Sequence, residues 1–147
     1  MIRIVTMSLL VLASIALADD YEQRTKLMGS WQVEASGASD VSSWTLQELP
    51  EGMHIAGSDG GKTVIEFNCK MGQECDIKDS GHHAKMTMYF NGAKLVQNET
   101  IGSRVIRRRF TVIGDGNTMQ LEVIPLEPEG KTETTTFKRV STESAKQ

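Results

Sequence analysis

The stretch RVIRRRFTVIGDGNTMQLEVI, residues 104–124, decides the fold expected of this chain. Apolar and polar side chains alternate through residues 104–113 and again through residues 119–124, and a Gly-rich turn lies between them. The pattern predicts two antiparallel strands with Ile106, Arg108 and Phe110 on the inward face. Arg108 is the exception on that face. A guanidinium keeps its charge in proteins, so an inward Arg108 requires a partner anion from the protein or from a ligand.

The rest of the chain repeats this strand pattern. Asp20 and Gln23 have capping-box spacing, so one short helix ending at Gly29 is expected first. Short strands and tight turns then predict an all-β fold, an antiparallel up-and-down meander of about 8 to 10 strands closed into a small barrel, because closure removes exposed edges. The alternating segments are residues 31–35, 44–47, 53–55, 64–69, 75–77, 86–90, 94–100, 104–113, 119–124 and 132–140.

Residues 1–18 have the features of a signal peptide. Arg3 gives a positive start, residues 4–17 are mostly apolar, and small residues precede Asp19 as they do at a cleavage site. The run falls short of the ~18 to 20 uniformly apolar residues of a transmembrane helix. We therefore expect an exported protein, periplasmic or secreted, with residues 19–140 as one barrel domain and residues 141–147 as a flexible tail.

The charge balance narrows the range of partners. The 147 residues include 16 Lys plus Arg and 19 Asp plus Glu, and loss of the signal peptide removes only Arg3, which leaves a net charge of −4. This balance predicts neither nucleic acid nor an anionic membrane surface as a partner, and no stable membrane insertion is expected. The outward arginines of residues 104–113 have Gln120 and Glu122 as natural cross-strand neighbours. The oligomeric state is left open.

The two cysteines, Cys69 and Cys75, enclose five residues around Gly72. An exported protein meets an oxidising compartment, so the pair is expected to form a structural disulfide across a hairpin. A redox role would usually use a two-residue spacing, which is not present here.

Gly29-Ser30-Trp31 resembles the Gly-x-Trp that opens the first strand in the lipocalin and fatty-acid-binding group of barrels, and the likeness is closest to small exported lipocalin-like proteins of bacteria. In that group the tryptophan packs near the barrel floor under a basic residue from the last strand. The resemblance implies that Arg139 is this partner and that Trp31 and Arg139 have a structural role.

Residues 106–110 are also similar to the strand of intracellular fatty-acid-binding proteins that aims an arginine at a ligand carboxylate, and Arg108 takes that position. The chain departs from this subfamily in two respects. The segment between Trp31 and Trp44 is too short for the paired helices that cover the cavity, and Thr135 and Phe137 stand where an Arg-x-Tyr pair would complete the carboxylate clamp.

The favoured functional hypothesis is a binding module that holds a small amphipathic or acidic molecule, with Arg108 as the polar anchor. The alternative is a barrel filled by its own side chains, with a structural or protein-interaction role in the cell envelope, in which Glu99 or Glu66 neutralises Arg108. The expected apolar lining of a binding cavity consists of Trp44, Phe67, Met86, Met88, Phe90, Phe110, Met119 and Leu121.

A third reading is copper binding through His82, His83, Met86 and Met88. Methionine at alternate strand positions is more often part of an apolar core, so we expect neither a metal nor a cofactor. The sequence has no Gly-x-Ser-x-Gly, His-Glu-x-x-His or phosphate-binding Gly-rich motif, and no catalytic residues are expected.

Overall fold

The computed structural model describes residues 20–35 and 39–140. The expected signal peptide and the expected C-terminal tail lie outside these residues. A helix covers residues 20–26, where the sequence predicted one, and ends three residues before Gly29. None of the helices in the described part of the chain is long and apolar enough to cross a membrane.

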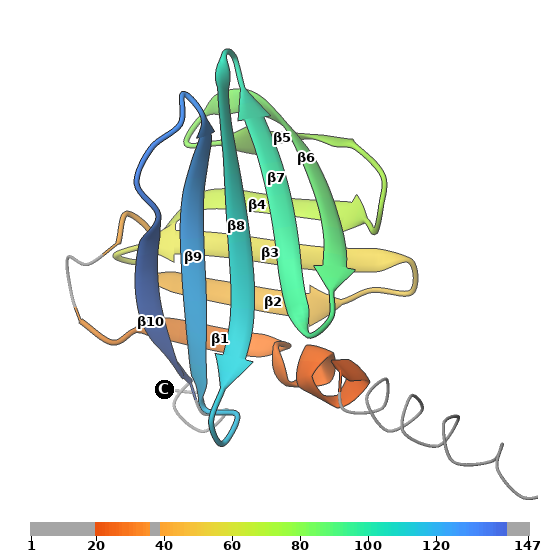
Figure 1. The fold of residues 1–147 in the computed structure, drawn as a ribbon, viewed down its shortest axis with the longest axis vertical. Coiled ribbons are helices and arrows are strands. Elements are labelled where there is room, and N and C mark those ends of the chain that lie inside the picture. The colour runs from red at the N-terminus through yellow and green to blue at the C-terminus, as the bar shows by residue number, and fades with distance from the viewer. Residues whose placement is uncertain (1–19, 36–38, 141–147) are drawn as a thin grey trace, which may run out of the picture.

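Ten antiparallel strands form one closed barrel, which confirms the predicted fold class (Figure 1). Each strand pairs with its neighbours in sequence, and the first strand pairs with the last to close the sheet. The strands are β1 (Gly29–Val33), β2 (Ser43–Glu48), β3 (Gly52–Asp59), β4 (Lys62–Lys70), β5 (Cys75–Asp79), β6 (His82–Asn91), β7 (Lys94–Ile101), β8 (Arg104–Ile113), β9 (Thr118–Glu127) and β10 (Glu133–Arg139).

The register of β8 and β9 agrees with the expectation for residues 104–124. Phe110 pairs with Leu121, and both are buried inside the barrel. Arg109 pairs with Glu122 on the outer side, where its guanidinium donates a hydrogen bond of 3.0 Å to the carboxylate. The period of two therefore assigns the two faces of this hairpin correctly.

The helix closes one end of the barrel, where Trp31 and Arg139 meet (Figure 1). Trp31 is fully buried and donates its indole N–H to the carbonyl of Leu27 at 2.9 Å. The Arg139 guanidinium lies 4.3 Å from the centre of the Trp31 ring and donates to the carbonyls of Met28, Gly116 and Lys26. These bonds tie the helix and the turn between β8 and β9 to the end of β10.

The backbone at position 29, two residues before Trp31, requires a glycine. Its φ of +123° lies in a region that favours glycine, and a Cβ at this position would stand 2.9 Å from Nη1 of Arg139. The chain thus turns from the helix into β1 in the space directly beside the guanidinium.

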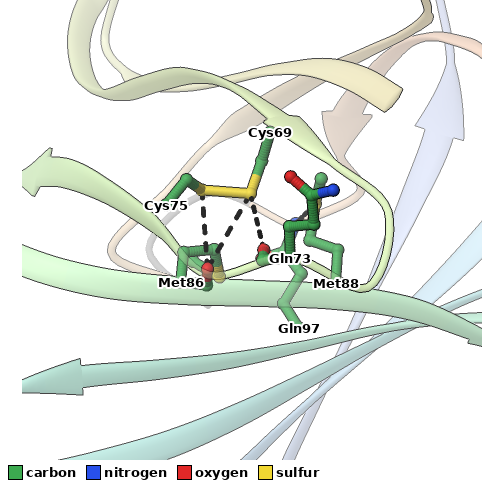
Figure 2. The surroundings of a disulfide bond; sticks show 6 residues. All are labelled: Cys69, Gln73, Cys75, Met86, Met88 and Gln97. Atoms are coloured by element: carbon green, nitrogen blue, oxygen red, sulfur yellow. Dashed lines mark hydrogen bonds between the residues drawn. A yellow bond between two sulfur atoms is a disulfide. The ribbon is translucent and has the colours of Figure 1, made fainter. Parts of the chain in front are cut away.

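Cys69 and Cys75 form a disulfide with a Cα–Cα distance of 5.9 Å, as the sequence predicted (Figure 2). The bond joins the end of β4 to the start of β5, and the carbonyl oxygen of Met86 on β6 lies 3.5 Å from Cys75 Sγ. Neither sulfur carries a proton, so this is a close contact and not a hydrogen bond. Because β4 and β5 share one register pair, Ile65 with Asp79, the disulfide holds the opposite end of a short seam.

We predict that Arg139→Met lowers the free energy of unfolding by about 2 to 4 kcal/mol, because three carbonyl groups lose a charged donor and Trp31 loses its cation. Urea denaturation followed by tryptophan fluorescence measures the change. Lys138→Met is the matched control, since Lys138 is exposed and its change should cost less than about 1 kcal/mol. Equal effects of the two substitutions would contradict the role assigned to Arg139.

We also predict that the double substitution Cys69→Ala/Cys75→Ala lowers the free energy of unfolding by about 2 kcal/mol, because a short loop in the unfolded chain is no longer closed. Thermal unfolding with and without a reducing agent measures this. The reductant should destabilise the parent protein and leave the variant unchanged, and an equal response of both would show that the bond does not form in solution.

Candidate functional site

A cavity of about 710 Å³ occupies the end of the barrel opposite the helix. Trp44 of β2, Arg108 of β8 and Leu121 of β9 line its inner part. Asp40, Lys131 and Glu133 line it near the connections between the strands, and we call this end the mouth. Arg108 therefore reaches a cavity that is large enough for a small organic ligand.

Arg108 is paired with two carboxylates. Its Nη1 donates to Oε2 of Glu99 at 2.7 Å, and its Nη2 donates to Oδ2 of Asp79 at 3.4 Å. The exposed fractions of these side chains are 11% for Arg108, 0% for Glu99 and 14% for Asp79. We call these three residues the acidic triad, because two acids share one base.

Of the two partners that the sequence offered for Arg108, the structure selects Glu99. Glu66 faces outward and lies 3.6 Å from His54 instead. Asp79 was missed as a partner. Its signal was available, because Asp79 is two residues after Ile77 on the same short strand and therefore shares its inward face.

Burial, as the largest cause, and the neighbouring Asp79 together raise the pKa of Glu99 from its usual 4.5 to about 7, although the charge of Arg108 opposes both. When Glu99 is ionised the acidic triad carries a net charge of −1. When Glu99 holds a proton the triad is neutral. Neither state leaves a free positive charge on Arg108.

Several buried polar atoms beside Arg108 have no hydrogen-bond partner among the described residues. They are Nε1 of Trp44, Oε1 of Gln97 and Oε1 of Glu99. Gln97 pairs in register with Arg108, and its amide Nε2 points to the sulfur of Met88 at 3.8 Å (Figure 2). Leaving such groups unpaired costs free energy. Of these three residues only Trp44 lines the mouth cavity, so a ligand there can supply a partner for its indole N–H.

The residues expected to line a ligand cavity lie in three different parts of the barrel. Trp44 and Leu121 line the cavity together with Arg108, and Trp44 packs edge to face on Phe110 at 5.3 Å. Phe90 lies elsewhere, at the helix end of the barrel. The other five are buried in the apolar core and do not line the mouth cavity: Phe67, Met86, Met88, Phe110 and Met119.

A second, smaller cavity of about 310 Å³ lies beside the helix and includes Phe90. The guanidinium of Arg24 lies 4.8 Å from the Phe90 ring and donates to the carbonyl of Gly92 at 2.7 Å. Arg24 thereby holds the helix against the turn between β6 and β7. This cavity lacks the buried ion pairs of the mouth cavity, and we take the mouth cavity as the candidate site.

The residues of the copper hypothesis do not converge. Met86 and Met88 are fully buried, whereas His82 and His83 are exposed, although His82 lies at the mouth of the cavity. Within residues 20–35 and 39–140, no group of three or more His, Cys, Asp or Glu side chains is placed to hold a metal ion.

We predict that Glu99→Gln becomes more stable relative to the parent protein as the pH rises from about 5 to about 8. Between the usual pKa of 4.5 and the folded value of about 7, the native state holds a proton that the unfolded chain releases, so parent stability falls with rising pH across this window. The relative shift should be about 1 to 3 kcal/mol in urea titrations. Glu66→Gln, on an exposed glutamate, should show no such shift, and a flat difference for Glu99→Gln would contradict the assignment.

Comparison of the sequence with protein-family models and with curated proteins gives no match. Comparison with solved structures gives many. A fatty acid binding protein of Schistosoma mansoni in complex with arachidonic acid has a TM-score of 0.66 and 21% identity, covering 81% of this chain and 99% of that one. Fatty-acid-binding protein 1 of Echinococcus granulosus has a TM-score of 0.66 and 14% identity, covering 80% and 99%.

Secretory abundant heat soluble protein 4 of Ramazzottius varieornatus is similar to a comparable extent, with a TM-score of 0.62, 16% identity and coverage of 78% of this chain and 94% of that one. Identities this low establish the fold and nothing further. The chain therefore has the fold of the lipocalin and fatty-acid-binding group of barrels.

Proposed function

We propose that this barrel binds a small hydrophobic or amphipathic molecule in the mouth cavity. The apolar part of the ligand lies against Trp44, Leu121 and Val123, and its polar end lies at Arg108, the polar anchor of the site. The observation that carries the proposal is a cavity of about 710 Å³ with a buried charged cluster at its inner end. Small-molecule sites typically have this size and this mixture of an apolar lining with a few fixed polar groups.

Two of the similar structures are named as fatty-acid-binding proteins, one of them in complex with arachidonic acid. Because unrelated functions recur on one fold, this supports a hydrophobic ligand here without identifying it. The cavity, and not the fold, carries the argument.

We further propose that the protein is exported and that its ligand is met in the periplasm or outside the cell. The leader-like sequence of residues 1–18 supports export, and so does the Cys69–Cys75 disulfide, because such bonds persist in oxidising compartments.

A barrel filled by its own side chains is the second candidate, with a structural or protein-interaction role in the cell envelope. The ion pair between Arg108 and Glu99 favours it, since Arg108 is neutralised without any ligand. Core residues such as Met88, Phe110 and Met119 fill part of the barrel interior.

We propose binding and not catalysis for the mouth cavity. Glu99 has a pKa near 7, which suits a general acid or base. However, its carboxyl group is fully buried and its Oε2 accepts a hydrogen bond from Arg108, so a bound molecule meets Arg108 and Asp79 before Glu99.

We predict that Thr135→Phe, which places a bulky ring in the mouth cavity, weakens binding of the uncharged fluorescent probe N-phenylnaphthylamine at least about tenfold, because the ring takes ligand volume. Fluorescence titration measures the affinity. The matched control is Thr134→Phe, the next residue of β10, which is exposed and does not line the cavity. The proposal fails if the parent protein binds no probe, or if the two variants bind it equally.

A further inference from the structure

The charge around Arg108 differs from what a site for a negatively charged ligand requires. Two of the guanidinium nitrogens already donate to carboxylates, Nη1 to Glu99 and Nη2 to Asp79. A ligand carboxylate placed at Arg108 would therefore lie beside two acids that already share the positive charge of Arg108. Like charges at such separations in a poorly solvated site repel strongly.

The charged residues at the mouth of the cavity do not offset the negative charge of the acidic triad. Its other charged groups are Asp40 and Glu133, which are acidic, and Arg104 and Lys131, which are basic. His82 is exposed beside them. The two signs cancel at the entrance, so the net charge that a ligand meets is set by the acidic triad.

The hydrogen-bonding groups that line the site favour a particular kind of ligand head group. Nε1 of Trp44 is a donor without an acceptor among the described residues, and the carboxylate of Asp79, which also lines the cavity, is an acceptor. A hydroxyl or an amide can donate and accept at once, whereas a carboxylate can only accept. Trp44 and Asp79 both line the cavity, whereas Glu99 is fully buried and does not line it.

We propose that the mouth cavity selects amphipathic molecules whose head group donates hydrogen bonds and carries no negative charge, such as a long-chain alcohol, over the matching carboxylate. The head group lies at Asp79 and Arg108 and meets Nε1 of Trp44. This inference rests on the proposed function and narrows it, since a hydrophobic ligand alone leaves the charge of its head group open.

The test uses the whole protein and compares decanol with decanoate, at about pH 8, as competitors of N-phenylnaphthylamine. Any apolar cavity disfavours an ion to some extent, so the decisive quantity is the change in the alcohol-to-carboxylate preference between variants. In Asp79→Asn/Glu99→Gln, which leaves Arg108 as the only charge of the triad, we expect this preference to fall at least about tenfold.

The matched control is Glu66→Gln/Asp76→Asn, which removes the same number of acids from exposed positions of the barrel surface. Its preference should equal that of the parent protein. If the double variant does not fold, Asp79→Asn alone replaces it in the test. This variant changes the more exposed acid of the triad, and we expect a smaller change in the same direction.

The outcomes separate the two proposals. Tighter binding of decanoate than decanol by the parent protein, or a preference that neither Asp79→Asn nor the double variant changes, overturns the head-group inference and leaves ligand binding intact. Failure of the parent protein to bind the probe and both competitors overturns the proposed function and the inference with it.

Discussion

An arginine inside a closed sheet must find its counter-charges within that sheet. Arg108 cannot lose its proton, and solvent reaches little of its side chain, so the barrel supplies Glu99 and Asp79 from the neighbouring part of the wall. Burying these groups is costly, and the raised pKa of Glu99 records that cost. The inner end of the mouth cavity is consequently polar, because apolar side chains cannot pack against unpaired charges without a further penalty.

The second interior arginine shows how differently the two ends of the barrel are built. Arg139 is satisfied by backbone carbonyls and by the face of Trp31, in contacts that hold the helix, the β8–β9 turn and β10 together. Those partners are fixed parts of the fold and leave no group to be completed by a ligand. Arg108 instead lies in a site that still contains unpaired buried atoms. The helix is fixed at the end near Arg139, and the mouth cavity lies at the end near Arg108.

The strand pattern of the sequence was sufficient to predict the barrel and the inward direction of Arg108, because both follow from alternation along the strands. The disulfide was predicted from the expected export of the protein to an oxidising compartment. The partners of Arg108 were harder to predict from the sequence, because they depend on which strands lie near one another in the folded barrel. Glu99 was anticipated from its strand, but Asp79 lies 29 residues from Arg108 along the chain and on β5, which is not a direct neighbour of β8 in the sheet. Nor could alternation separate core from lining, because Phe110 and Leu121 pair in register and face the same way, yet only Leu121 lines the mouth cavity.

The proposed class of ligand follows from the contacts of Arg108 and not from the fold. The charge that an inward arginine offers to a ligand depends on what already contacts that arginine. Here one guanidinium serves two carboxylates, and the proton on Glu99 shifts the cluster between neutral and negative without ever making it positive. In the head-group proposal, an anion at Arg108 therefore has to share the guanidinium with two protein carboxylates, whereas a neutral donor adds no further negative charge to the cluster. The counter-ions within the wall thus set the class of ligand that the cavity can hold.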